Sequence, residues 1–372
     1  MFKLMKTKFK NTDFILLMLT IACTVFGCVA ISSAVKSFDG GAKFVIIQSA
    51  SAIIGFVMIF IISMIDYEKY RSFSSFIYTV CIMLLIAVLV FGTGREDTGS
   101  KSWIRFGPIG IQPSELVKIG FIITFSHLCS KYSDELNKPK NILKLCIHAG
   151  ILMGFIMLQP DFGTTMVFAV IFAGILFAAG ISYKYIIATG ACVAVSIPLV
   201  WNFFLAEYQK NRIRVLFDPE SDPLGTGYHV MQSKIAIGSG GIIGKGYGHG
   251  TQTQLGFLPA RHTDFIYSVI GEEFGIIGSL IVALLLFALV IRCLYVAKKS
   301  KGKFGSYICI GVACMFLAHI FENIGMCIGL MPVTGIPLPF FSYGGSSILA
   351  NMMAIGLVES VAMRKDYIRF NE

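Results

Sequence analysis

A guanidinium, an imidazole, a hydroxyl and a carboxylate follow one another where a long polar segment gives way to an apolar one: Arg261, His262, Thr263 and Asp264. A carboxylate at the edge of an apolar region has a pKa that desolvation raises and nearby cations lower, which is the adjustment a general base requires. The run therefore favours proton-transfer chemistry at Asp264, assisted by its neighbours. An Asp just before a helix is also a common N-cap, and the local pattern alone favours that structural role.

Two further groups of polar residues stand directly before apolar stretches. They are Arg105, Gln112, Ser114, Glu115 and Lys118 in the segment 99–118, and Asp161 after Gln159-Pro160. Ser114 is suited to cap a helix, and Glu115 and Lys118 have the i,i+3 spacing of an ion pair on that helix. Asp161 has the same position relative to the next apolar run. By themselves these patterns favour helix-start roles over catalysis.

Ionisable and amide side chains also occur inside apolar stretches: Glu272 and Glu273 in one, and His319, Glu322 and Asn323 on one face of another. Such residues are costly within a lipid bilayer, by about 2.5–3.5 kcal/mol for a charge at a helix centre, so they face a protein interior or a wet cavity. They predict either a polar cavity between helices or polar pairing that helps helices pack. The residues alone favour neither.

The elements that position these groups follow from the composition. The 372-residue chain is 55% hydrophobic and only 14% charged, which excludes an ordinary soluble domain. A helix of about 20 apolar residues crosses about 30 Å of hydrocarbon. This criterion predicts ten spans, at 14–35, 45–65, 73–92, 114–129, 142–158, 162–180, 184–205, 265–291, 304–330 and 343–363. The fold class is therefore an all-α polytopic membrane protein.

Lys and Arg gather in alternate segments between the spans, such as 3–10, 131–144 and 292–303. The positive-inside rule then places both termini in the cytoplasm and the long segment 206–264, between the seventh and eighth spans, outside. Its glycine-rich part is not a P-loop, because Lys245 is followed by Gly246 and Ser239 stands where that motif requires glycine. A flexible surface loop is the commoner meaning of such a stretch. The scattered basic residues give no nucleic-acid surface.

Three long motifs resemble the SEDS family of RodA and FtsW. They are Gly227-Tyr228-His229 with the run 232–241, the run Leu258-Pro259-Ala260-Arg261-His262-Thr263-Asp264-Phe265-Ile266, and Asn323 with the run 331–347. The resemblance covers essentially the whole chain, 1–372, as a single transmembrane domain. The run 250–255 and the arginine before His262 are more similar to RodA. Gly256 and Ala260 stand where many relatives have acidic residues.

The resemblance implies a peptidoglycan polymerase that joins lipid II units at the outer face of the bacterial cytoplasmic membrane. It also implies that Asp264 is the essential carboxylate and that Arg105, Gln112, Glu115, Lys118 and Asp161 belong to the polar site around it. Ser342 lies in the family signature, where a structural turn and a substrate contact are equally expected. Arg261, His262 and Thr263 complete the candidate site.

The expected reaction has Asp264 as a general base that activates an acceptor hydroxyl, with undecaprenyl diphosphate as the leaving group. Basic groups such as Arg105 and Lys118 would stabilise the leaving diphosphate, and a divalent cation such as Mg²⁺ is a further candidate, although no metal motif is present. The expected partners are lipid II, the lipid-linked glycan, a class B penicillin-binding protein and other membrane proteins of the elongation complex. The alternatives are a lipid II flippase and a non-catalytic scaffold for cell-wall enzymes.

Overall fold

The computed structural model describes residues 12–94, 100–106, 109–203, 207–223 and 225–364. Long helices dominate these residues and confirm an all-α polytopic membrane protein. The ten that correspond to the predicted spans are α2 (Phe14–Ala34), α3 (Ala42–Met64), α5 (Ser74–Phe91), α7 (Pro113–Lys131), α8 (Pro139–Met157), α9 (Phe162–Ala179), α10 (Tyr183–Phe203), α14 (Ile266–Lys299), α15 (Lys303–Cys327) and α16 (Gly345–Ala362). A short helix, α4 (Tyr67–Ser72), and a hairpin of β1 (Ile104–Phe106) and β2 (Ile109–Ile111) connect some of them.

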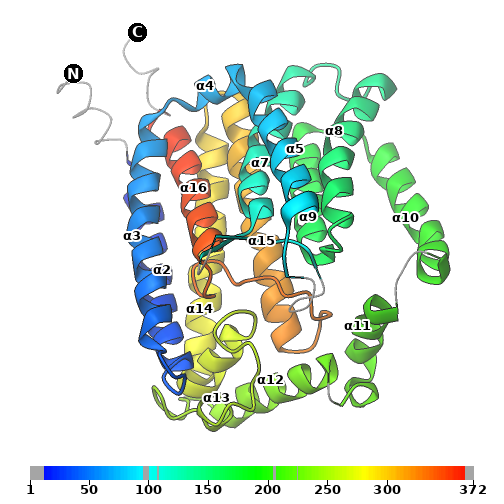
Figure 1. Cartoon of the computed structure of the whole chain (residues 1–372). Helices are drawn as coiled ribbons and strands as arrows, with labels where there is room; N and C mark the ends of the chain where they lie inside the picture. The colour runs from blue at the N-terminus through cyan, green and yellow to red at the C-terminus, as the bar shows by residue number, and fades with distance from the viewer. Residues whose placement is uncertain (1–11, 95–99, 107–108, 204–206, 224, 365–372) are drawn as a thin grey trace.

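The helices run up and down, so the start of α2 and the end of α16 lie at one end of the bundle (Figure 1). Three helices are joined there. The guanidinium of Arg292 in α14 donates to both oxygens of Asp13 at 2.8 and 2.9 Å, and the amide of Asp13 donates to Glu359 of α16 at 2.6 Å. The segment 206–264 lies at the opposite end, in agreement with the predicted separation of the termini from that segment.

Nine helices of the described chain are long and apolar enough to cross a membrane, and α7 has the length but not the composition. Its 19 residues include Glu115, Lys118 and Lys131. Neighbouring helices shelter α7, since most of its residues are buried and it packs against α5, α9 and α15. A helix surrounded by protein in this way can carry charged residues through a membrane.

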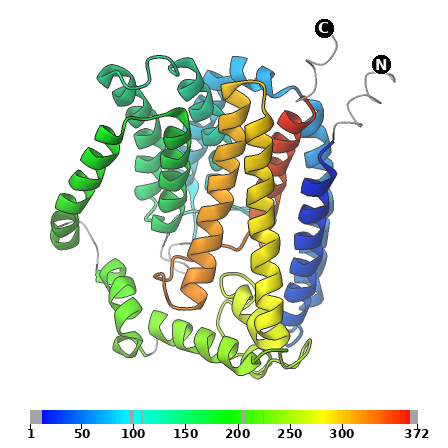
Figure 2. The same cartoon turned by 180° about the vertical axis from the view of Figure 1, so that it is seen from behind.

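Helix α10 is separated from the rest of the bundle, as views from both sides show (Figures 1 and 2). In its most apolar window no residue is buried inside the protein. By contrast, α16 is largely enclosed and packs tightly on α3, where Gly55 leaves room for the side chain of Met352. Small residues at helix contacts let backbones approach closely, as is usual in membrane bundles.

Much of the described part of the segment 206–264 is helical, where a flexible surface loop was the commoner expectation for its glycine-rich stretch. It contains α11 (Glu207–Phe217), the 3₁₀ turn Pro219–Ser221, α12 (Thr226–Gly240) and the short α13 (Thr251–Gln254). Helix α12 lies across the end of the bundle against α14 (Figure 1). Gly240 makes this contact possible, because a Cβ there would lie 2.0 Å from the carbonyl oxygen of Gly271.

Helix α14 is longer than its predicted span and is broken near its start. Gly275 has φ 68° and ψ −164°, values that interrupt the helix and that an L side chain rarely adopts. The break separates a short first part, Ile266–Phe274, from the long part that follows. Residues 264–274 therefore precede the break, at the end of the bundle opposite the termini.

Candidate functional site

Asp264 lies in a tight turn directly before α14. Ala260 has φ +46°, and its carbonyl oxygen accepts hydrogen bonds from the amides of Thr263 and Phe265 at 3.1 and 3.2 Å. The N-cap residue of α14 is Phe265, and no side chain in the described chain caps this helix start. The structural alternative for Asp264, a helix cap, is therefore wrong.

The backbone of this turn is held from α15 and from the segment after it. Asn323 donates to the carbonyl oxygens of Asp264 and Ile336, both at 2.8 Å. The hydroxyl of Ser342 donates to the carbonyl of Thr263 at 2.6 Å, and the amide of Tyr343 donates to the carbonyl of His262 at 2.8 Å. Ser342 thus positions the backbone next to Asp264.

Asp264 is only partly exposed. Burial raises its pKa to about 6, while the charge of Arg212 in α11 and the side chain of Thr263 act in the opposite direction. An isolated aspartate would titrate near 3.9. At neutral pH Asp264 is therefore ionised but more basic than usual, which suits a proton acceptor.

The segment Thr334–Pro337 runs beside α15 and contacts its polar residues. The Thr334 hydroxyl donates to Glu322 at 3.3 Å, and the Pro337 carbonyl accepts from the imidazole of His319 at 3.0 Å. Between them, a Cβ on Gly335 would lie 3.5 Å from a carboxylate oxygen of Asp264. Sequence reasoning placed His319, Glu322 and Asn323 on one face of a span but did not connect them to Asp264.

Glu115 and Lys118 form the predicted i,i+3 ion pair, at 2.8 Å, and both residues are buried. Lys118 also lies 2.8 Å from the Nε2 atom of His319. Because an ammonium group only donates, Nε2 accepts this hydrogen bond and Nδ1–H donates to Pro337. One oxygen of Glu115 has no partner in the described chain, nor does the buried hydroxyl of Ser114. Ser114 does not cap α7, since the N-cap residue is Gln112.

Asp161 caps α9, as the structural interpretation predicted, but it does more than that. One oxygen accepts from the amide of Thr164 at 3.0 Å, and the other accepts from Ser102 at 3.2 Å and from Gln112 at 3.3 Å. Asp161 therefore joins the segment before α7 to the start of α9. Arg105, in β1, lies between Ser102 and Gln112 in the sequence; it is exposed and has partners of its own.

Arg261 and His262 point away from the carboxylate, so the expected convergence of three groups does not form. The guanidinium of Arg261 donates to Ala34 at 2.9 Å and to Ser37 at 2.6 Å and lies 4.4 Å from the ring of Phe38. The His262 ring packs edge-on against the rings of Phe38 and Phe44, and burial lowers the pKa of its imidazole. These two residues anchor the turn to the connection between α2 and α3.

A cavity of about 70 Å³ lies between α9, α11 and the segment 332–334. Arg212 and Gln209 of α11 line it, together with Pro160, Phe162, Ile213 and Pro332–Thr334. Sequence reasoning missed Arg212, the cation that acts on Asp264. Its helix has the spacing of an ordinary charged surface helix, so the sequence carries no signal for this role.

Within the described residues, no three His, Cys, Asp or Glu side chains gather as a metal site would require. Asp264 alone offers too few oxygens for Mg²⁺, which prefers six ligands and is usually held in part by substrate phosphates. A divalent cation at this site therefore stays a prediction that depends on oxygens from the substrate.

Comparison with known proteins places this arrangement in a family. The family model of cell cycle proteins that covers FtsW, RodA and SpoVE matches residues 11–367. The chain is 38% identical to the peptidoglycan glycosyltransferase MrdB of Escherichia coli K12, over 94% of this chain and 93% of that protein. It is 36% identical to a probable peptidoglycan glycosyltransferase FtsW of Trichlorobacter lovleyi, with the same coverage.

Two solved structures have the same fold. One comes from work on the coordination of polymerization and crosslinking by a peptidoglycan synthase complex, with a TM-score of 0.81, 29% identity, and coverage of 96% of this chain and 99% of that one. The other is the rod shape determining protein RodA of Thermus thermophilus, with a TM-score of 0.71, 25% identity, and coverage of 94% and 96%. The chain belongs to the SEDS family of RodA, FtsW and SpoVE proteins.

Proposed function

We propose that Asp264 is the general base with which this protein joins lipid II units into glycan strands. The chain is a peptidoglycan glycosyltransferase and a multi-pass protein of the cytoplasmic membrane, as its family and its relatives indicate. One observation carries the assignment of the base. Asp264 is a carboxylate whose backbone is fixed by Asn323 of α15 and by Ser342 of the segment after it, whose side chain does not cap a helix, and whose pKa is about 6.

In the proposed reaction, Asp264 takes the proton from the 4-hydroxyl of the acceptor N-acetylglucosamine. The hydroxyl oxygen forms a bond to the anomeric carbon of the donor N-acetylmuramic acid, from the face opposite the leaving group. The bond from that carbon to the diphosphate oxygen breaks with inversion, and undecaprenyl diphosphate carries away the electron pair. The proton on Asp264 then passes to water, which restores the base.

Cations near Asp264 would stabilise the charge that develops on the leaving diphosphate. Arg212 is the best placed of them, because it acts on Asp264 and lines the adjacent cavity. Arg105 is exposed on the β1–β2 hairpin, between the two Asp161 partners Ser102 and Gln112, and we propose it as a second cation for this stabilisation. Lys118 is enclosed by Glu115 and His319, so its charge would act through the wall of the site rather than by contact.

The partner we propose is a class B penicillin-binding protein, which would crosslink the strands that this chain makes. The support is the fold, which matches a chain from the peptidoglycan synthase complex over nearly its whole length. Other membrane proteins of the elongation machinery would assemble on the same pair. The greater likeness to MrdB than to FtsW proteins supports a role in elongation and cell shape.

The experiment uses the purified chain, alone and with its penicillin-binding partner, in vesicles that contain labelled lipid II. We expect Asp264→Asn to lower the rate of polymer formation by about 10²–10⁴-fold, the usual contribution of a general base. Asp134→Asn is the matched control, since Asp134 is exposed at the other end of the bundle. Polymerisation by Asp264→Asn at the wild-type rate would refute the assignment. Movement of lipid II across the bilayer without polymer would favour a flippase, and neither activity would favour a scaffold.

A further inference from the structure

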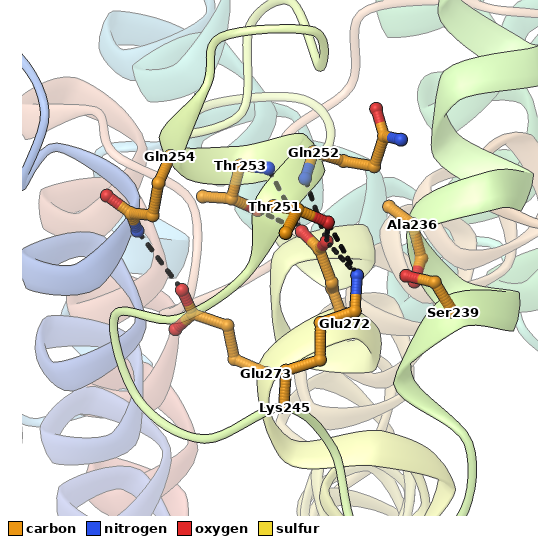
Figure 3. A network of polar contacts seen from close by, with 9 residues as sticks. All are labelled: Ala236, Ser239, Lys245, Thr251, Gln252, Thr253, Gln254, Glu272 and Glu273. Atoms are coloured by element: carbon orange, nitrogen blue, oxygen red, sulfur yellow. Dashed lines mark hydrogen bonds and ion pairs between the residues drawn. The ribbon is translucent and has the colours of Figure 1, made fainter.

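Glu272 lies two turns into α14, eight residues after Asp264, and its carboxylate is fully buried. Both of its oxygens are saturated by the segment 245–253, as Figure 3 shows. One oxygen accepts from the ammonium of Lys245 at 2.9 Å, from the amide of Gln252 at 2.8 Å and from the hydroxyl of Thr251 at 3.3 Å. The other accepts from the amide and the hydroxyl of Thr253 at 3.0 and 2.7 Å.

The carboxylate of Glu272 supplies the N-terminal cap that α13 does not have in its own sequence. Helix α13 has only four residues, and its N-cap residue, Gly250, has no side chain to accept a hydrogen bond. The first amides of a helix need acceptors, and buried amides without them are costly. Gly250 also makes room for the carboxylate, because a Cβ there would lie 2.6 Å from an oxygen of Glu272.

The break in α14 binds the same segment through the backbone. The carbonyl oxygens of Glu272 and Glu273, near the break at Gly275, accept from the amides of Lys245 and Gly246 at 3.0 and 2.9 Å. The side chain of Glu273 accepts from Gln254 at 3.2 Å and from the hydroxyl of Ser33 in α2. Glu273 therefore pairs with a polar residue of another span, which is one of the two roles that the sequence left open, whereas Glu272 binds the segment 245–253 instead.

These contacts close a loop that contains Asp264. The hydrogen bonds from Gln252 and Thr253 to Glu272 span 20 and 19 residues, and Asp264 lies between their ends. Inside the loop, the amide of Leu258 donates to the carbonyl of Gln252 at 3.2 Å and the Leu258 side chain is buried. The chain therefore has little freedom between α13 and the turn that carries Asp264.

We propose that Glu272 is a positioning residue. Its hydrogen bonds with Gln252 and Thr253 close residues 252–272 into a fixed loop, the clasped loop, and thereby hold the Asp264 carboxylate at its place in the site. The inference rests on the proposed function of Asp264. It assigns to Glu272 no contact with substrate. Displacements of about 1 Å at a reacting group can cost 10²-fold in rate, so a loosened loop would be seen in catalysis.

The decisive variant is Glu272→Gln, which keeps the shape of the side chain. Its amide nitrogen would face a backbone amide or Lys245, which are donors themselves, so the cap of α13 is lost on one side. We expect hydrogen exchange at the amides of Gln252 and Thr253 to rise at least tenfold and the polymerisation kcat to fall at least tenfold. Glu272→Asp keeps the charge and should recover part of both effects. Glu135→Gln, in an exposed ion pair on the other side of the bundle, is the matched control.

The pH–rate profile separates positioning from a general loss of folded protein. A loosened loop admits water to Asp264, so its pKa falls and the acid limb of the profile moves to lower pH. The other charged or titratable groups that face Asp264, Arg212 from α11 and Cys327 from α15, lie outside the clasped loop. A smaller fraction of folded enzyme would lower the rate without moving the limb.

If Glu272→Gln does not fold, Thr253→Val is the second variant, since it removes one hydrogen-bond donor to Glu272. It should raise hydrogen exchange at Gln252 and Thr253 and lower the polymerisation kcat, each by two- to fivefold. Wild-type exchange at Gln252 and Thr253, or an unmoved acid limb in a variant with lowered kcat, would overturn the positioning role. Full activity of Asp264→Asn would instead refute the proposed function, and the exchange data would still decide whether Glu272 closes the loop.

Discussion

Two carboxylates near the start of α14, eight residues apart, have opposite surroundings. Glu272 is fully buried, and every hydrogen bond it accepts comes from one neighbouring segment. Asp264 is partly exposed and its backbone carbonyl accepts from Asn323. Burial raises the pKa of its carboxyl group, while the charge of Arg212 and the side chain of Thr263 act in the opposite direction. A saturated carboxylate holds structure, whereas one with a fixed backbone and available oxygens can exchange a proton with a substrate.

The strongest way to sharpen this contrast is to neutralise each carboxylate separately. Asp264→Asn should abolish nearly all polymerisation, by about 10²–10⁴-fold, and leave hydrogen exchange in the segment 245–262 unchanged. It should also raise the melting temperature at pH 7. The folded pKa of about 6 exceeds the unfolded value near 3.9, so protonated Asp264 favours the folded state. This contribution to stability is lost as pH rises through 6, and at pH 7 the ionised carboxylate destabilises the folded protein. A less stable, equally active variant would contradict the contrast.

The second test concerns the cation beside Asp264. Arg212→Gln should lower the polymerisation kcat by about 10–10²-fold, if Arg212 stabilises the leaving diphosphate as we propose. It should also move the acid limb of the pH–rate profile to higher pH, because Arg212 lowers the pKa of Asp264. Arg214→Gln on the exposed face of the same helix is the matched control. Equal effects of Arg212→Gln and Arg214→Gln would show that the net charge of α11 affects the reaction and that the position of Arg212 does not.

The third test loosens the backbone of Asp264 and leaves its side chain intact. Asn323→Leu removes both hydrogen bonds to the carbonyls of Asp264 and Ile336, so we expect a loss of about tenfold in kcat. Binding of lipid II should change less than kcat. Activity of this variant at the wild-type level would show that the clamp from α15 does not position the base.

The smallest effect is expected at Arg261, whose charge is directed toward α2. Arg261→Gln removes its contacts with Ala34, Ser37 and Phe38 and should lower the melting temperature. The acid limb of the pH–rate profile should stay in place, since the charge does not act on Asp264. A shift of that limb comparable to the effect of Arg212→Gln would place Arg261 in the site after all.

The sequence predicted the parts of the site that depend on local spacing. The Glu115–Lys118 pair and the cap at Asp161 follow from one helical turn and are present. The directions of Arg261 and His262 could not be predicted, because they depend on Phe38 and Phe44, more than 200 residues earlier in the chain. The role of Glu272 depends on how the glycine-rich segment folds back on α14, and a hydropathy pattern contains no information about that contact.

The spans were predicted well where composition alone decides them. The fourth predicted span is instructive, since α7 carries charges that lower its hydropathy but is enclosed by its neighbours. The helices and close contacts within the described part of residues 206–264 were missed. A glycine-rich composition does not distinguish glycines that allow close approach to α14 from glycines in a flexible loop.

The pH–rate profile of polymerisation by the purified enzyme at saturating lipid II tests the central claim most directly. If Asp264 is the base, the rate should fall with a one-proton slope on an acid limb centred at about pH 6, and the residual rate of Asp264→Asn should show no such limb. A wild-type rate that does not change between about pH 5 and pH 8, or a limb that persists in Asp264→Asn, would contradict it.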